Sequence, residues 1–556
     1  MPNKWYENEK LMNLSKRCDD AFFSQSESEL SLLVDECYTN AHDLSNDATV
    51  RARYFYIAFT THGNLIDLKV KNTASQNVNY TNVHCKAKTE TRNLFETYHQ
   101  KSLYLARNAF EILQSEKHNN EDISAEDYAY MKYMQLFEWQ LNVNYANFFY
   151  QKGRFVKATE LLNGFDTKIE FPMGTAQLGM KLYELSRYHY DQSHQKILLY
   201  KAYHYIRQAS ESEYPEKEEM VNLINIYMKN IISIVGQDFL DKQLAITDFI
   251  CPHKEKLPEN ETTYREWTAC HKLSLNILND VFSSLEVGYD PLLLPTMTEK
   301  LDSSKVQNLF GLFNQIKQEY TSARFLAYEG LAFREPHFSD KSVYLINTLD
   351  YPVYGLGIEK IKACYRAVYS IFDKISFFLN EYFEIGIDRS RISYYRLFSP
   401  KKNVNDKIKI IDLAENNQPL CGLWWIFKDV RNINIDANGR EDNGNSREHY
   451  KHIDSVMNSI SDVRNAMEHG YLKVLDFYCK ESSISDNNFD QLAYKISFKD
   501  FEELTLQLLK YVREAIILLV FSVKRAEEIK ESERKTDEIL LPMFADIYDD
   551  DWKQIF

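Results

Sequence analysis

The sequence predicts an all-α protein, in which an α-solenoid of helical hairpins over residues 1–290 precedes a four-helix bundle over residues 291–535. The chain has only 16 Gly and 12 Pro in 556 residues, which is poor in the turns that many short strands need. Apolar residues recur at helical spacing, and no segment alternates convincingly with a period of two. The 38 Tyr and 33 Phe are typical of tightly stacked helices, whose rings fill the gaps between them.

The bulk composition indicates a globular protein with more than one domain, because domains usually hold roughly 100–200 residues. The net charge of −15 argues against non-specific coating of nucleic acid, which needs clustered Lys and Arg, although a local basic groove remains open. The eight cysteines are scattered, with no C-x-x-C and no Cys/His group at metal-ligand spacing. They indicate free thiols in a reducing compartment.

Targeting signals and common enzyme motifs are missing from the sequence. The first ten residues lack the apolar stretch of a signal peptide, and the longest strongly apolar run, residues 515–521, is too short to cross a bilayer. Motifs for nucleotide hydrolysis, dinucleotide binding, zinc proteolysis and α/β-hydrolase chemistry do not occur. We therefore expect a soluble cytoplasmic protein that uses no membrane, no cofactor and no metal.

From about residue 10 to 290, amphipathic helical segments alternate with short polar breaks. The clearest unit, at 144–162, predicts a helix that ends at Gly153 and a second helix that packs the small Ala158 closely against the first. This unit resembles a tetratricopeptide repeat, and residues 54–63 and 183–209 resemble such a repeat more weakly. The period is irregular, so we expect a degenerate array, whose concave face binds a protein partner or trigger.

The segment 288–295 carries a Gly and two prolines, which predicts a linker or a rigid bridge. Helical patterns follow at 302–330, 358–383, 450–474 and 498–530, and four helices predict a bundle. The stretch 386–447 is expected to be an irregular insertion that ends in an Asn/Gly-rich loop. The tail at 536–556 combines acidic and aromatic residues, and it is either a frayed terminus or a peptide that docks on a partner or masks a basic groove.

A set of polar residues near the C-terminus fits phosphate chemistry: Arg464, Asn465 and His469 stand in the order R-N-x-x-x-H within a predicted helix. Asn465 and His469 share a face and can pair, while Arg464 lies about 100° round the helix. Metal-free RNA cleavage needs a base for the 2′-hydroxyl, an acid for the leaving 5′-oxygen and a cation for the phosphorane. Histidine and arginine supply these groups, and a two-fold dimer would supply the second histidine.

The spacing alone is weak evidence, because a chain with 22 Arg and 14 His holds about one such pair by chance. Arg447 and His452 form a pair with the same spacing, but the pair lacks the Asn and falls at or before the helix start. For the preferred pair the alternative is a surface ion pair, with Glu468 as the i+4 partner of Arg464.

The context of the motif resembles the HEPN superfamily, whose signature is R-x4-6-H with a polar residue, often Asn, directly after Arg. In this chain the set R-N-A-M-E-H-G lies late in a four-helix domain and precedes a long final helix. The stretches 347–354, 359–362 and 369–375 also resemble early helices of bacterial HEPN families that carry helical-repeat N-termini. The resemblance covers roughly residues 303–530, although the insertion at 386–447 is longer than a minimal HEPN domain has.

The resemblance implies a homodimer with a composite active site and metal-independent RNA cleavage, in which Arg464 and His469 are catalytic and Asn465 supports them. It also implies a toxin-like role in bacterial antiphage defence or growth arrest. The alternative is a non-catalytic HEPN module that dimerises and recruits a partner protein. A further alternative is a HEPN-type domain that handles nucleotides and restrains or modifies a partner protein.

Residues 386–410 carry an excess of positive charge within an acidic chain. This excess predicts RNA binding, in which cations contact phosphates and aromatic rings stack on unpaired bases. The predicted RNA-binding residues are Arg389, Arg391, Arg396, Lys401, Lys402, Tyr394 and Tyr395. The alternative is a solvated loop with ordinary core aromatics. Lys374 and Glu468 are further candidates for supporting the site. For Lys374 a buried pairing with Asp373 is an equally good interpretation.

Overall fold

The computed structural model describes residues 8–74, 89–119, 128–165, 171–214, 217–242, 244, 257–299, 304–332, 335–348, 352–398, 410–414, 416–431, 455–476, 492–534, 546–548 and 550–553. Helices dominate this part of the chain, which confirms the predicted all-α class. The strands that the structure describes form one small sheet, in which β1 (Leu472–Leu475) pairs in parallel with β2 (Tyr494–Ser497).

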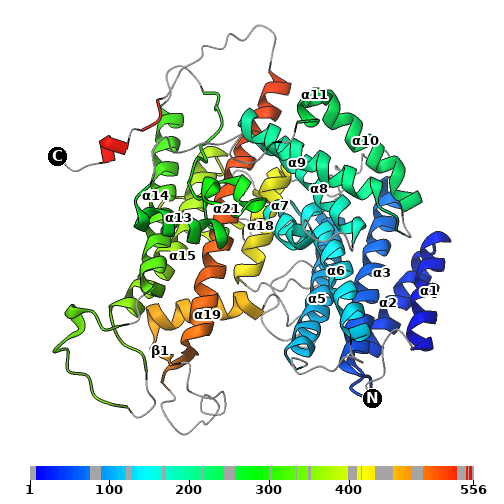
Figure 1. The fold of residues 1–556 in the computed structure, drawn as a ribbon, viewed down its shortest axis with the longest axis horizontal. Coiled ribbons are helices and arrows are strands. Elements are labelled where there is room, and N and C mark those ends of the chain that lie inside the picture. Colours follow the sequence, from blue (N-terminus) through cyan, green and yellow to red (C-terminus); the bar gives the residue numbers. More distant parts are fainter. Residues whose placement is uncertain are drawn as a thin grey trace.

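The N-terminal half is a succession of helices, each packed on the next, as an array of hairpins requires (Figure 1). Side-chain caps explain several starts, because Asn8, Ser26 and Asp191 each accept a hydrogen bond from a backbone N–H of the first turn. The helices are α1 (Glu9–Phe23), α2 (Glu27–His42), α3 (Ala48–Ala74), α5 (Thr89–Asn119), α6 (Tyr128–Gln151), α7 (Phe155–Leu162), α8 (Pro172–Tyr188), α9 (Gln192–Glu211), α10 (Lys217–Val235) and α11 (Gln237–Leu240).

The hairpin predicted at 144–162 is present. Helix α6 ends at Gln151, Gly153 adopts a left-handed φ of 78°, and α7 follows with Ala158 fully buried. The weaker repeat-like segment at 183–209 likewise spans the end of α8 and most of α9. The other weak segment, at 54–63, contains no turn, because Gly63 lies inside the long helix α3.

The Gly/Pro-containing segment at 288–295 is a bridge that side-chain hydrogen bonds join to the bundle. It follows α13 (Glu259–Cys270) and the short turns η4 (Ile277–Asp280) and η5 (Leu285–Val287). Arg324 donates to both carboxylate oxygens of Asp290 at 2.8 Å, and Lys317 donates to the Leu292 carbonyl at 2.6 Å. The bridge is therefore bound to the first helix of the bundle, on which both cations lie.

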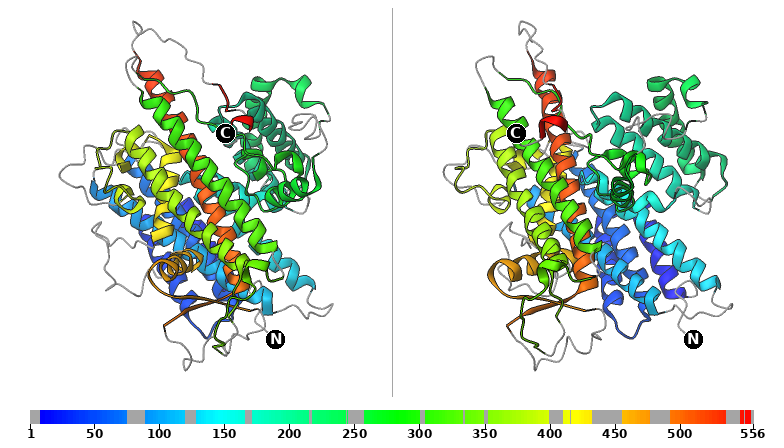
Figure 2. Two further views of the ribbon diagram at one scale, coloured as in Figure 1. Left: turned by 90° about the vertical axis from the view of Figure 1, so that its left-hand side faces the viewer. Right: turned by 60° about the vertical axis from the view of Figure 1, so that its left-hand side comes forward.

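The C-terminal half is the predicted bundle. Long helices α14, α15 and α21 run side by side, and α19 crosses near their lower end (Figure 2). Its helices are α14 (Lys305–Ala332), α15 (Leu356–Tyr382), α18 (Gln418–Arg431), α19 (Ser455–His469) and α21 (Phe498–Glu533), with the short η6 (Phe338–Asp340), α16 (Tyr394–Phe398) and α17 (Ile410–Ala414). The patterns at 302–330, 358–383 and 498–530 are confirmed as α14, α15 and α21.

Two local predictions for the bundle are wrong. The helix expected at 450–474 ends at His469, since Gly470 follows and residues 472–475 are the buried strand β1. The stretch 386–447, expected to be irregular, contains α18, a core helix whose Leu420, Leu423 and Ile426 are completely buried. The burial of α18 comes from its packing against α21, which is distant in sequence, so no local pattern marks it as a core helix.

At the C-terminal end, a short turn η7 (Asp550–Lys553) leaves Tyr548 and Trp552 more than half exposed. None of the helices in the described ranges is long and apolar enough to span a membrane.

Candidate functional site

The end of α19 carries the three residues of the R-N-x-x-x-H motif. Ile460 and Val463 are fully buried, and the Tyr365 hydroxyl of α15 donates to the Ile460 carbonyl at 2.9 Å. This anchoring directs the opposite face outward, so Arg464 is half-buried while Asn465 and His469 are exposed. The three side chains of the motif therefore lie at the surface of the bundle.

Arg464 is held in place by two neighbours. Its guanidinium carbon lies 5.5 Å from the centre of the Tyr369 ring on α15, within the range of a cation–π contact. Its Nη1 also donates to Asn465 Oδ1 at 3.1 Å. Asn465 thus orients the arginine, whereas we expected it to orient His469. Within the described residues no hydrogen bond joins Asn465 to His469.

Glu468 binds a residue that sequence reasoning missed. Arg366 of α15 donates from Nε to Glu468 Oε1 at 3.1 Å and from Nη2 to the Met467 carbonyl at 3.2 Å. The alternative in which Glu468 pairs with Arg464 is therefore not what the structure contains. Arg366 instead fixes the last turn of α19, which carries His469. Nothing in the local pattern of α15 marks this arginine, because its partners lie about a hundred residues along the chain.

Lys374 is engaged by a carboxylate of another helix. Its Nζ lies 2.8 Å from Glu319 Oε2 on α14, and about a quarter of the lysine side chain is exposed. The predicted buried pairing with Asp373 is wrong, because Asp373 Oδ1 instead accepts a hydrogen bond from the Tyr394 backbone N–H at 2.8 Å. Asp373 thereby holds the start of α16 against α15.

The predicted RNA-binding segment is only partly exposed. Arg389 and Arg391 are exposed, and Arg389 pairs with Glu381 at 2.6 Å. Tyr395 is 37% exposed, and Arg396 is half-buried with no hydrogen-bond partner for its Nε in the described part of the chain. Lys401 and Lys402 lie outside the described residues.

Tyr394 corrects this prediction, because it belongs to the core. Only 3% of its surface is exposed, its ring packs 4.8 Å from that of Phe372, and its hydroxyl donates to the Leu423 carbonyl at 2.9 Å. A buried ring with a satisfied hydroxyl cannot stack on a base. The packing does bring α16 beside Phe372, one turn of α15 beyond the Tyr369 that contacts Arg464.

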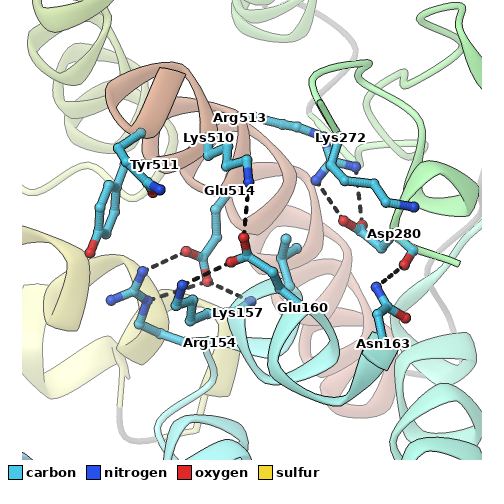
Figure 3. Close-up of a pocket in the computed structure, with 12 residues that line it drawn as sticks. Arg154, Lys157, Glu160, Asn163, Lys272, Asp280, Lys510, Tyr511, Arg513 and Glu514 are labelled. Atoms are coloured by element: carbon cyan, nitrogen blue, oxygen red, sulfur yellow. Dashed lines mark hydrogen bonds and ion pairs between the residues drawn. The ribbon is translucent and has the colours of Figure 1, made fainter. Parts of the chain in front are cut away.

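A second polar cluster lines a cleft between α7 and α21 (Figure 3). Buried Arg154 contacts Glu514 and Asp429, each at 2.6 Å. Burial by itself raises the pKa of Glu160. The ammonium groups of Lys157 and Lys510, 2.8 and 3.1 Å from its carboxylate, nevertheless lower this pKa to about 2.

Nearby, Arg513 pairs with Asp280 at 2.7 Å. The cations of this cluster are largely matched by carboxylates from distant parts of the chain. Its arrangement therefore suits a structural junction between the N-terminal helices and the bundle. Sequence reasoning missed it, since its pairs, apart from Lys157–Glu160, join residues more than 200 positions apart.

The described cysteines are free thiols: Cys18, Cys37, Cys270, Cys364 and Cys421. Within the same ranges, no group of three or more His, Cys, Asp or Glu side chains could hold a metal ion.

The fold and the exposed end of α19 define an all-helical bundle with a polar motif at one end and a helical array attached along its side. Residues 300–526 match the model of the family described as LA2681-like HEPN. The match begins just before α14 and ends within α21, so it includes the helices and strands around Arg464 and His469. No curated protein and no solved structure matches the chain. The C-terminal region is thus similar to HEPN domains, as the motif led us to expect.

Proposed function

We propose that the chain is a metal-independent endoribonuclease of the HEPN type. The observation that carries the proposal is the position of Arg464, Asn465 and His469, which lie together on the outward face at the end of α19. This end belongs to the region that is similar to LA2681-like HEPN domains. Because Asn465 and His469 are exposed, a long strand of RNA can reach them without any opening of the fold.

The proposed reaction is an in-line attack of the RNA 2′-oxygen on the adjacent phosphorus. A base takes the 2′-hydroxyl proton, the bond from phosphorus to the 5′-oxygen breaks, and an acid protonates that oxygen, which leaves a 2′,3′-cyclic phosphate. His469 would act in proton transfer, and Arg464 would stabilise the charged phosphorane. Each motif supplies a single histidine, so we propose that two copies of α19 form one site.

The RNA path that we propose runs from the end of α19 along the surface near α16. The exposed Arg389, Arg391 and Tyr395 would contact phosphates and a base, and they lie on the segment that packs beside α15. The pairing of Arg389 with Glu381 is solvent-exposed, so it costs little to exchange for a phosphate.

The N-terminal helices would sense a partner or trigger. Support comes from α10, which exposes four apolar side chains, among them Ile226 and Ile234 at 55% and 54%. A nuclease with such a sensor fits a toxin-like effector of antiphage defence or growth arrest in the cytoplasm. The substrate classes that we propose are tRNA, mRNA and rRNA.

The test is RNA cleavage by the purified full-length protein, assayed with and without EDTA. We expect His469→Ala and Arg464→Ala each to slow cleavage by about 10²–10⁴-fold, because each removes one transition-state group. EDTA should change the rate of the wild type by less than twofold.

The matched control is His452→Ala, which removes the histidine of the second Arg/His pair and should leave the rate unchanged. This residue lies outside the described ranges. Equal RNA decay in the wild type and both motif variants would refute the catalytic assignment and favour a non-catalytic interaction module. Loss of cleavage on addition of EDTA alone would refute the metal-free mechanism.

A further inference from the structure

The segment between α14 and α15 exposes four consecutive apolar side chains. Val343, Tyr344, Leu345 and Ile346 are 58%, 94%, 57% and 87% exposed. A folded domain rarely leaves such a run in water unless the surface binds something. We call residues 341–348 the arm.

From Val343 to Thr348 the arm forms no helix, strand or turn. The exposed fractions alternate along it, so Tyr344 and Ile346 lie on one outward face, as in a β-strand. The backbone groups of residues 344–346 make no backbone hydrogen bond to the described part of the chain. Such a segment can add to another chain as an edge strand does.

Both ends of the arm are fixed to the bundle. Before it, Asp340 Oδ2 accepts hydrogen bonds from the backbone N–H groups of Leu356 and His337 at 3.0 and 3.3 Å. After it, the Val353 N–H donates to the Val474 carbonyl of β1 at 2.8 Å. The chain on both sides of the arm is thus held against the bundle, and the apolar residues are carried outward. Because the flanking chain is already ordered, binding would cost less conformational entropy.

We propose that the arm packs on a second copy of this chain, at the end of the bundle that carries α19. The choice of a second copy rests on the proposed function, because a composite site needs a second α19 close to the first. The arm leaves from this same end, since Val353 pairs with β1, which begins three residues after the last residue of α19 (Figures 1 and 2).

Apolar side chains that could receive the arm are exposed at this end as well. Tyr471, which follows Gly470, is 39% exposed, and Leu492, just before β2, is 87% exposed. In a two-fold dimer each contact occurs twice, so one arm and one receiving surface per copy form two identical interfaces. The same two-fold axis would bring the two motifs towards each other.

The experiment compares the full-length wild type with the double variant Tyr344→Asp, Ile346→Asp by sedimentation velocity over a range of micromolar concentrations. Both side chains are almost wholly exposed, so the variant should fold normally, which circular dichroism and the melting temperature check. We expect the wild type to dimerise and the dimer Kd of the variant to rise at least about tenfold. The matched control is Leu32→Asp, Leu44→Asp, which replaces two residues of the N-terminal array, on α2 and in the turn before α3, that are 71% and 80% exposed and should not change the Kd.

A photo-crosslinker at position 344, in a mixture of isotope-labelled and unlabelled protein, adds a direct readout. Crosslinks between labelled and unlabelled chains near Tyr471 or Leu492 support the proposal, and crosslinks confined to single chains refute it. A monomeric wild type, or a variant with an unchanged Kd, also refutes it.

These readouts use no RNA, so they are independent of the catalytic test. If the motif variants retain cleavage while the arm variant becomes monomeric, the proposed function is refuted and the proposal for the arm is supported. If the motif variants lose cleavage while the arm variant stays dimeric, the proposal for the arm is refuted and the proposed function is supported.

Discussion

Single side chains at the end of α19 are positioned from α15. The last carbonyl groups of a helix have no partner within it, and a cation there also interacts favourably with the helix dipole. Arg366 supplies both contacts, because it binds the Met467 carbonyl and Glu468 in the turn that carries His469. The Tyr369 ring, one turn along α15, supports Arg464 by a cation–π contact. The geometry of the candidate site thus depends on α15 as much as on the motif itself.

A buried lysine gives a prediction at this scale. Lys152 is 3% exposed, and burial lowers its pKa to about 7, with its ammonium 5.7 Å from the centre of the Phe148 ring. Between pH 7 and about 10.5 the unfolded chain binds more protons at this residue than the folded chain, so its contribution to stability rises with pH.

We expect Lys152→Met to raise the free energy of unfolding at pH 6 by a few kcal/mol, since one pKa unit corresponds to about 1.4 kcal/mol. The gain should shrink as the pH rises towards 10. Urea unfolding of both proteins at pH 6 and pH 9 measures it, and an equal difference at the two pH values would contradict the role of the buried charge.

At the scale of elements, two glycines decide how the helical array meets the bundle. A Cβ at Gly153 would lie 2.0 Å from the Gln418 carbonyl oxygen, and one at Gly422 would lie 2.4 Å from the Gly153 carbonyl oxygen. The turn between α6 and α7 therefore touches α18 backbone to backbone. This contact places α18 in the core between the array and α21.

The prediction for this crossing is that Gly422→Ala destabilises the protein by ~1–3 kcal/mol, because the new methyl group meets backbone that cannot move away. Its control is Gly63→Ala within α3, where no atom lies within 4 Å. That change should stabilise the protein by ~0.5–1 kcal/mol through helix propensity. Thermal unfolding followed by circular dichroism tests both, and equal melting temperatures for the two variants would rule out the close contact.

On the scale of the whole molecule, the array and the bundle are joined by buried ion pairs. Arg154 lies between Glu514 of α21 and Asp429 of α18, and Asp429 also accepts a hydrogen bond from Arg107 of α5 at 2.9 Å. Ion pairs of this kind add little net stability compared with apolar packing, but removing one partner leaves a buried charge unpaired. They therefore favour one arrangement of the two halves over others.

We expect Arg154→Met to lower the free energy of unfolding by ~3–5 kcal/mol, because Glu514 and Asp429 remain buried without their shared cation. Arg17→Met serves as the control, since its pair with Glu36 is about half exposed and should contribute at most ~1 kcal/mol. Equal midpoints of urea unfolding for the two variants would show that the junction does not stabilise the native arrangement.

The sequence by itself determined the all-α class, helices α14, α15 and α21, the hairpin at Gly153 and the presence of the R-N-x-x-x-H motif. These features depend on local periodicity, capping and turn residues, which neighbouring positions in the chain specify.

Only the tertiary structure decided that Tyr394 is core, that α18 is a buried helix, that residues 472–475 form a strand and that Arg366 holds the last turn of α19. In each case the deciding partner is distant in sequence: Phe372 for Tyr394, α21 for α18, β2 for β1 and Glu468 for Arg366. Burial and pairing of this kind are set by the packing of the whole chain, which no local pattern encodes.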